Sequence, residues 1–284
     1  MSESPGLIVS LLQALVLGLV QGITEFLPIS STAHLLIWTK VFHWQMLGEK
    51  YFVDAIQFGS VIAVVLYFRR DIQAILIGSW QAYQAKNWHR EEWKIFLGIV
   101  IGTVPALAGG MIYKIFLPEA TQTILEGAMV ISVMSIVMAL LLGLAETFGQ
   151  HKRDFNQLTL QDGLGVGLGQ MLALIPGASR SGSTITTALF LGLKRDTAAR
   201  FSFLLGLPTL TLATLYQSLE IVHHLNALPA LLIGITSTFI FSYLSIAWLL
   251  QYLRRQSAWI FVWYRLGFGL ALISAIGAGV ISMT

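Results

Sequence analysis

The fold is decided by two stretches of sequence, GLVQGITEFLPISSTAH at residues 18–34 and GLGQMLALIPGASRSGST at residues 167–184. Each stretch lies inside a long apolar run and interrupts it with a proline, Pro28 or Pro176, among hydroxyl side chains. Irregular backbone at membrane depth survives only where protein or a water-filled cavity satisfies its polar groups. We therefore predict that residues 7–36 and 164–193 form two re-entrant helix–loop–helix hairpins that turn inside the protein.

The rest of the chain has the composition of a membrane protein. Of its 284 residues 56% are hydrophobic and only 11% are charged, whereas soluble domains carry about 25% charged residues. Six further runs are long enough to cross a hydrocarbon core of about 30 Å. They cover residues 52–68, 95–112, 124–144, 201–219, 228–250 and 259–283. We predict an all-α integral membrane protein, a single polytopic domain over residues 1–284, with six transmembrane helices and the two hairpins.

Composition also excludes several classes of function. Spans of this length leave no room for a large extramembrane domain. The chain has no cysteine, which excludes disulfides, a thiolate nucleophile and a cysteine-based zinc site. The net charge of +3 is small and gives no support for nucleic-acid binding.

The two broken stretches resemble each other. Gly18-Leu19-Val20-Gln21 followed by Pro28 recurs as Gly167-Leu168-Gly169-Gln170 followed by Pro176. We predict two repeats, over residues 1–147 and 158–284, each with one hairpin and three spans. An odd number of spans places the second repeat in the opposite orientation, as in several transporters.

The positions of the basic residues agree with an inverted-topology repeat. If the 69–94 connection is cytoplasmic, alternating crossings place twelve of the 17 Lys and Arg residues on that side. Only Lys40, Lys50 and Lys114 lie outside, while Arg180 and Arg265 fall at membrane depth. The first hairpin then enters from the outer side and the second from the cytoplasm.

The first hairpin gathers residues that can carry out chemistry. Gln21 and Glu25 are four residues apart and share a helix face, and Ser31 and His34 are three apart on the next helix. Ser30 and Thr32, at the start of that second helix, are candidates for substrate binding together with Gln21. The alternative is structural, with hydroxyls that cap the helix and a paired charge at Glu25. Ionisable residues inside the membrane are functional candidates by default.

The second hairpin is typical of a phosphate-binding site without a Walker lysine. The substrate-binding candidates here are Gly177, Ser179, Ser181 and Thr184, and Arg180 joins Glu25, Ser31 and His34 as a catalytic candidate. A helix that begins near Ser179 directs free N–H groups and its positive dipole end toward the tip, where Arg180 adds a guanidinium for two phosphate oxygens. Close helix packing is an alternative explanation for the small residues, but not for an arginine, which costs at least about 2.5–3.5 kcal/mol at the bilayer centre.

Other polar residues give weaker signals. Asp54 and Gln57 near the outer end of the first span face either the cavity or the interface, and Gln57 is a further candidate for substrate binding. Arg265 either supports the site or reaches toward the membrane surface. Glu126, Glu146 and Asp162 lie near the ends of spans, where solvated faces are the commoner explanation. His223 and His224 indicate a polar loop without a metal.

The two hairpin motifs resemble those of the undecaprenyl-diphosphate phosphatase family, also called bacitracin-resistance proteins. The resemblance covers nearly the whole chain and includes residues 198–205 and the pair Tyr264-Arg265. It implies a hydrolase of the bacterial inner membrane that converts undecaprenyl diphosphate to the monophosphate. This reaction recycles the lipid carrier of peptidoglycan and cell-wall synthesis, and abundant family members confer bacitracin resistance.

The resemblance also implies roles for individual residues. The family's acidic motif falls on Gln21 and Glu25, its nucleophile or hydroxyl ligand on Ser31, its histidine on His34 and its phosphate-binding arginine on Arg180. Many relatives carry glutamate where this chain has Gln21, which puts a two-carboxylate metal site in doubt. We expect Mg²⁺ or Ca²⁺ at Glu25, with Gln21 as a second candidate ligand and substrate phosphates completing the shell.

The expected mechanism is in-line displacement at the terminal phosphorus. Ser31 attacks with His34 or Glu25 as base, or an activated water attacks with Ser31 as a ligand. A rival function is transport of the polyprenyl phosphate, because inverted repeats with broken helices are a transporter architecture. The expected partners are the lipid diphosphate and membrane lipids, with any oligomer a homodimer, and we expect the active site to face the outer side.

Overall fold

The structure is a computed structural model that describes residues 6–42, 44, 50–217 and 227–281. Within these ranges the protein is helical, and an isolated bridge pairs Arg153 with Leu193. The α-helices are α1 (Leu7–Phe26), α2 (Ser31–Val41), α3 (Lys50–Tyr67), α4 (Arg69–Gln84), α5 (Glu91–Phe116), α6 (Glu119–Leu125), α7 (Ala128–Phe148), α8 (Leu160–Gln170), α9 (Arg180–Phe190), α10 (Arg195–Gln217), α11 (Leu228–Leu253) and α12 (Trp259–Gly277). Two 3-10 turns, η1 (Phe155–Gln157) and η2 (Met171–Leu174), flank α8. The predicted fold class is confirmed.

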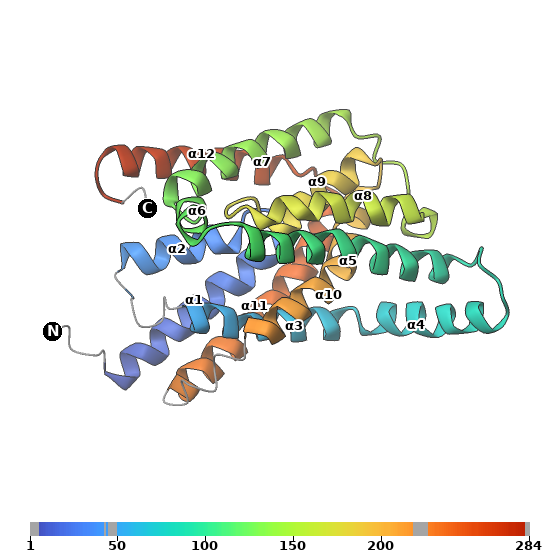
Figure 1. Ribbon diagram of the computed structural model, residues 1–284, viewed down its shortest axis with the longest axis horizontal. Coiled ribbons are helices and arrows are strands. Elements are labelled where there is room, and N and C mark those ends of the chain that lie inside the picture. The colour runs from blue at the N-terminus through green and yellow to red at the C-terminus, as the bar shows by residue number, and fades with distance from the viewer. Residues whose placement is uncertain (1–5, 43, 45–49, 218–226, 282–284) are drawn as a thin grey trace.

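Six described helices are long and apolar enough to cross a membrane: α1, α5, α7, α10, α11 and α12. A seventh span is formed if α3 and α4, which meet at a bend of 65°, are counted together. The chain is therefore a multi-pass membrane protein. The predicted six spans included α3 and not α1, because α1 was assigned to a hairpin. Figure 1 shows α2 returning from the middle of the molecule toward the end where α1 begins, which is the course of a re-entrant hairpin.

The structure contains two helices that the sequence analysis did not identify. Helix α4 occupies most of the predicted 69–94 connection and packs along the start of α5, where Ser79 Oγ donates to the carbonyl of Glu92 at 2.9 Å. Helix α6 is separate from α7, so this span begins at Ala128 and not at residue 124. His223 and His224 lie outside the described residues.

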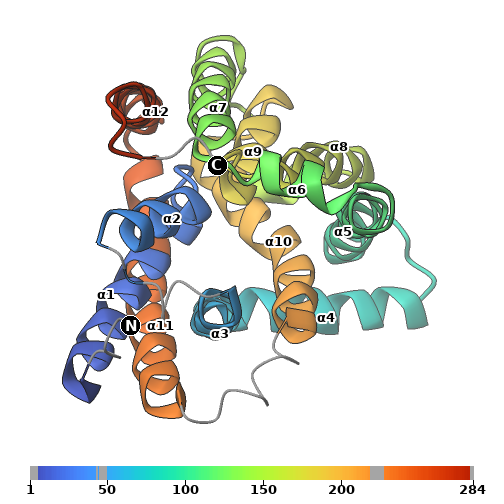
Figure 2. The same cartoon turned by 60° about the vertical axis from the view of Figure 1, so that its left-hand side comes forward.

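Each hairpin packs against the half of the chain to which it does not belong. In Figure 2, α1 runs beside α11, and α8 runs beside α5. Glycines allow these close approaches: a Cβ at Gly18 would lie 2.5 Å from the carbonyl of Gly234, and one at Gly167 would lie 2.2 Å from that of Gly102. This exchange of partners supports the inverted repeat, whose boundaries at 1–147 and 158–284 stay a prediction.

The expectation of solvated faces at Glu146 and Asp162 is wrong. Their side chains are only 2% and 3% exposed, because arginines from other segments pair with them. Arg195 Nε donates to Glu146 Oε1 at 2.7 Å, and Arg153 donates to both Asp162 oxygens at 2.7 and 2.6 Å. Glu126 is exposed, as expected. The first ion pair joins the end of α7 to the start of α10, and the second joins α8 to the segment that precedes it.

Candidate active site at the hairpin tips

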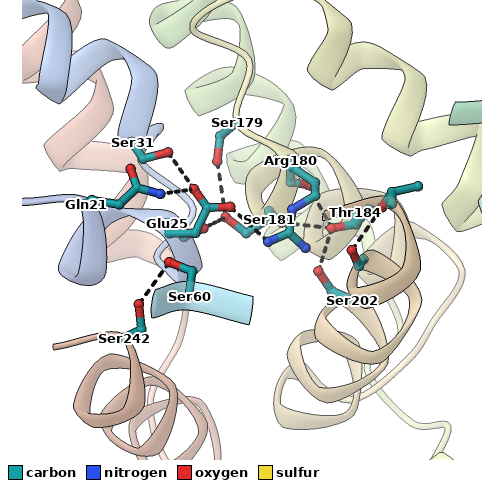
Figure 3. A network of polar contacts seen from close by, with 12 residues as sticks. Gln21, Glu25, Ser31, Ser60, Ser179, Arg180, Ser181, Thr184, Ser202 and Ser242 are labelled. Carbon is teal, nitrogen blue, oxygen red and sulfur yellow. Dashed lines mark hydrogen bonds and ion pairs between the residues drawn. The ribbon is translucent and has the colours of Figure 1, made fainter. Parts of the chain in front are cut away.

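Glu25, near the end of α1, is the centre of the polar network at the hairpin tips (Figure 3). Its Oε2 accepts hydrogen bonds from Ser31 Oγ at 2.7 Å and from Gln21 Nε2 at 3.0 Å. Its Oε1 forms an ion pair with Arg180 Nη2 at 3.0 Å. The structure thus brings together three of the four predicted catalytic residues, which come from segments more than 150 positions apart in the chain.

The two tips share one local conformation. Ser30 precedes α2 with φ 74° and ψ 100°, and Ser179 precedes α9 with φ 74° and ψ 121°. Each serine caps its helix: Ser30 Oγ accepts from the N–H of Ala33 at 3.4 Å, and Ser179 Oγ accepts from that of Gly182 at 3.1 Å. Both helices therefore present their N-terminal ends at the site, a favourable arrangement for an anion.

Direct hydrogen bonds hold the tips together. Ser181 Oγ lies 3.1 Å from the carbonyl of Glu25 and 3.0 Å from that of Leu27, and 3.2 Å from Ser179 Oγ. Ser181 is fully buried, so it serves as a contact between the hairpins in this structure. The predicted meeting of the two tips is confirmed.

Arg180 lies between Glu25 and α10. Its side chain is 14% exposed, and its backbone carbonyl accepts from Thr184 Oγ1 at 2.8 Å. Thr184 Oγ1 also contacts Ser202 of α10. A Cβ at Gly206 of α10 would lie 1.9 Å from Arg180 Nη1, so only glycine leaves room for the guanidinium as placed.

Arg265 of α12 joins both tips through their backbones, so of the two alternatives for this residue the structure favours support of the site. It is 1% exposed, and its Nη1 donates to the carbonyl of Pro28 at 3.0 Å and to that of Ala178 at 3.2 Å. Its Nη2 donates to the carbonyl of Gly177 at 2.8 Å. Gly177 has φ +89°, and a Cβ there would lie 2.8 Å from the Cα of Ile131, so this turn requires glycine.

His34 is buried, and its ring nitrogens contact groups other than the Ser31 hydroxyl. Its Nδ1 is 2.7 Å from the carbonyl of Ser30, and its Nε2 is 2.7 Å from the hydroxyl of Tyr264. Nδ1 therefore carries the proton and Nε2 accepts from Tyr264. The ring also stacks on Phe268 at 4.4 Å between centroids. Of the two predicted bases, only Glu25 contacts the Ser31 hydroxyl.

Two predicted substrate-binding residues lie outside the network among the described residues. Thr32 is exposed, and neither it nor the half-buried Gln57 shows a side-chain hydrogen bond to Glu25 or Arg180. Two serines beside the network were not predicted: Ser60 of α3 and Ser242 of α11, both fully buried, have their Oγ atoms 3.0 Å apart. No sequence signal distinguishes them from serines that only allow close helix packing.

The metal site at Glu25 stays a prediction. Among the described residues there is no cluster of three His, Asp or Glu side chains that could hold an ion. Glu25 and Ser31 offer oxygen donors that suit a hard cation, but Gln21 directs its N–H and not its oxygen to Glu25. These residues fit an ion only with the help of other ligands, such as substrate phosphates.

The chain is similar to a known protein family and to several named relatives. Residues 14–271 match the family described as Bacitracin resistance protein BacA. The chain belongs to the bacitracin resistance protein BacA family. A relative named undecaprenyl-diphosphatase, from Thermosynechococcus vestitus, is 55% identical over 94% of this chain and 96% of its own length. Relatives of the same name from Nostoc sp. and Synechococcus elongatus are each 49% identical, over 96% and 94% of this chain and 86% and 93% of their own.

The matched range of the BacA family contains the tips of both hairpins and Arg265. The resemblance inferred from the motifs is therefore confirmed. The individual roles that the family resemblance gives to Glu25, Ser31, His34 and Arg180 stay predictions, which the geometry above supports to different degrees.

Proposed function

We propose that this protein hydrolyses undecaprenyl diphosphate to undecaprenyl phosphate and inorganic phosphate, and so recycles the lipid carrier of cell-wall synthesis. The activity follows from membership of the BacA family and from relatives named undecaprenyl-diphosphatase. The observation that carries the chemistry is the position of Glu25. One of its oxygens is 2.7 Å from the Ser31 hydroxyl and the other 3.0 Å from the Arg180 guanidinium.

Ser31 is the proposed nucleophile and Glu25 its base. Glu25 takes the proton of Ser31 Oγ as this oxygen forms a bond to the terminal phosphorus and the bond from phosphorus to the bridging oxygen breaks. Undecaprenyl phosphate leaves, and water then hydrolyses the phosphoserine to release inorganic phosphate. In the alternative, a water activated by Glu25 attacks directly and Ser31 only holds it or the phosphate.

Phosphate binding is assigned to the second hairpin. Arg180 exchanges part of its contact with Glu25 for phosphate oxygens, and the N-terminal ends of α2 and α9 add positive potential. Phosphoryl transfer depends chiefly on positioning and electrostatics, which this arrangement supplies. His34 acts through its neighbours: with Tyr264 and the carbonyl of Ser30 it fixes the turn from which Ser31 projects.

A divalent cation is part of the proposal. Glu25, with Gln21 as second candidate, would hold Mg²⁺ or Ca²⁺ together with the substrate phosphates. When bound, the ion would offset negative charge on the leaving phosphate. Loss of activity with a chelator and its return with Mg²⁺ support this part, whereas full activity in chelator contradicts it.

The decisive experiment is release of inorganic phosphate from a C55 diphosphate by the purified protein in detergent. We expect turnover by the wild type and loss of kcat/KM in Arg180→Ala. Because removal of one partner from a buried ion pair also destabilises the fold by about 3–5 kcal/mol, each variant is compared at equal folded fraction. Wild-type kcat/KM in folded Arg180→Ala contradicts the proposal.

The alternative function, transport of the polyprenyl phosphate, predicts a different result in the phosphate-release assay. A carrier moves the lipid in vesicles without releasing phosphate, so absence of phosphate release together with lipid movement favours it over the hydrolase. The proposed orientation, with the first hairpin and the site facing the outer side, is tested by labelling single cysteines introduced into this cysteine-free chain.

A further inference from the structure

Gln170, the last residue of α8, belongs to the repeated motif but has no part in the mechanism above. Its side chain is 3% exposed. It occupies in the second hairpin the position of Gln21 in the first, since each lies nine residues before the positive-φ serine at the tip, Ser179 or Ser30. Gln21 faces the site and donates to Glu25. Gln170 holds the corresponding place in the opposite half of the chain, where it contacts Thr209 of α10.

The amide of Gln170 is only half satisfied. Its Oε1 accepts from Thr209 Oγ1 of α10 at 3.3 Å, but its Nε2 is buried with no partner among the described residues. Four residues after Gln21 stands the acceptor Glu25, whereas four residues after Gln170 stands Leu174. The second hairpin therefore lacks an acid that would accept from its glutamine.

The Nε–H of Arg180 is a second buried donor without an acceptor among the described residues. A single turn of α10 lies between the two donors. Thr209 Oγ1 donates to Gln170 Oε1 and also to the carbonyl of Gly206 at 2.9 Å. The guanidinium of Arg180 packs against Gly206 at the position that a Cβ would occupy. Buried donors are nearly always paired, so two of them on either side of one helical turn indicate a missing acceptor.

We infer that Gln170 is a substrate-binding residue, whose amide N–H donates, together with the Nε–H of Arg180, to phosphate oxygens of the lipid diphosphate. This inference rests on the proposed function and deepens it. The first hairpin supplies the groups that react, Glu25 and Ser31. The second supplies neutral and cationic donors that bind the diphosphate without adding a negative charge.

The test compares Gln170→Met and Gln170→Glu with the wild type in two assays. The first measures the Kd for inorganic pyrophosphate by calorimetry in detergent, and the second measures kcat and KM on the C55 diphosphate. Loss of a hydrogen bond to a charged group should weaken pyrophosphate binding about 10- to 100-fold in Gln170→Met. KM should rise by a similar factor with a smaller change in kcat. Gln170→Glu should bind more weakly still, because its carboxylate repels the phosphates.

Thermal stability separates binding from a structural role. Replacing the Gln170 amide by an apolar side chain of similar shape removes an unpaired N–H and one long hydrogen bond from Thr209, which keeps its bond to the carbonyl of Gly206. The melting temperature of the ligand-free protein should therefore stay unchanged or rise. A structural role gives the reverse pattern, a lower melting temperature with wild-type affinity. Thr214→Val is the matched control, since Thr214 of α10 is also fully buried and its hydroxyl is unpaired in the described structure. We expect this control to bind pyrophosphate like the wild type.

The outcomes distinguish this inference from the proposed function. If the wild type binds pyrophosphate and Gln170→Met binds it equally well, the inference is wrong even where the wild type hydrolyses the lipid. If the wild type does not hydrolyse the lipid but binds pyrophosphate through Gln170, the hydrolase proposal fails and the binding site stands. If the wild type does not bind pyrophosphate, the inference is wrong.

Discussion

Gly206→Ala should abolish most of the activity while the fold is retained. The added Cβ would lie 1.9 Å from Arg180 Nη1, and ordinary contact begins at 3.4 Å. The guanidinium must therefore move by about 1.5 Å, because a side-chain end yields more easily than the backbone of α10. Such a shift breaks its 3.0 Å contact with Glu25. A misplacement of about 1 Å at a reacting centre costs about 100-fold, so we expect kcat/KM to fall by at least this factor, or about 2.7 kcal/mol.

Stability should change little in the same variant. Alanine in place of glycine inside a helix is favourable by about 0.5–1 kcal/mol, which offsets part of the disturbed ion pair. The assay is phosphate release from the C55 diphosphate at equal folded fraction, with melting followed by tryptophan fluorescence. Gly98→Ala in α5 is the control, because the nearest atoms to its Cβ are 3.7 Å away. Wild-type kcat/KM in Gly206→Ala would refute the placement of Arg180 in the working site.

Three further perturbations test other parts of the structure. Ser31→Ala should lose turnover and the phosphoserine that acid quenching traps in the wild type; full activity would eliminate the covalent route. Arg265→Lys should have a lower melting temperature and a lower kcat, since one ammonium group cannot bond the carbonyls of Pro28 and Gly177 at once. An unchanged melting temperature would show that the tips do not depend on these hydrogen bonds. Asp162→Ala should lower stability by about 1.5–3 kcal/mol through lost charged hydrogen bonds, with kcat of the folded protein unchanged, and a melting temperature equal to wild type would contradict this.

The spans and the hairpins could be predicted from sequence because they depend on local features. Apolar runs of sufficient length identify helices such as α5 and α11 to within a few residues. Helix α4 was not predicted because it is amphipathic and lies against the charged start of α5, so it resembles a polar connection.

Residue types and their spacing predicted the part of the site that depends on neighbours in the sequence. A spacing of four residues correctly paired Gln21 with Glu25. A spacing of three residues also paired Ser31 with His34, but the His34 ring contacts Tyr264, 230 positions away. The burial of Glu146 has the same explanation, because its arginine partner lies 49 positions further along the chain. Contacts between distant segments depend on how helices pack, which local pattern does not encode.

The position of Arg265 in the chain has a consequence for biogenesis. This guanidinium is the group that ties the carbonyls of both tips, and it resides in α12, which follows every other described helix. A nascent chain that has inserted its first eleven α-helices still lacks this tie. The backbone contacts that Arg265 makes to both tips can therefore form only after α12 has been synthesised, and we expect a chain that stops before α12 to lack them.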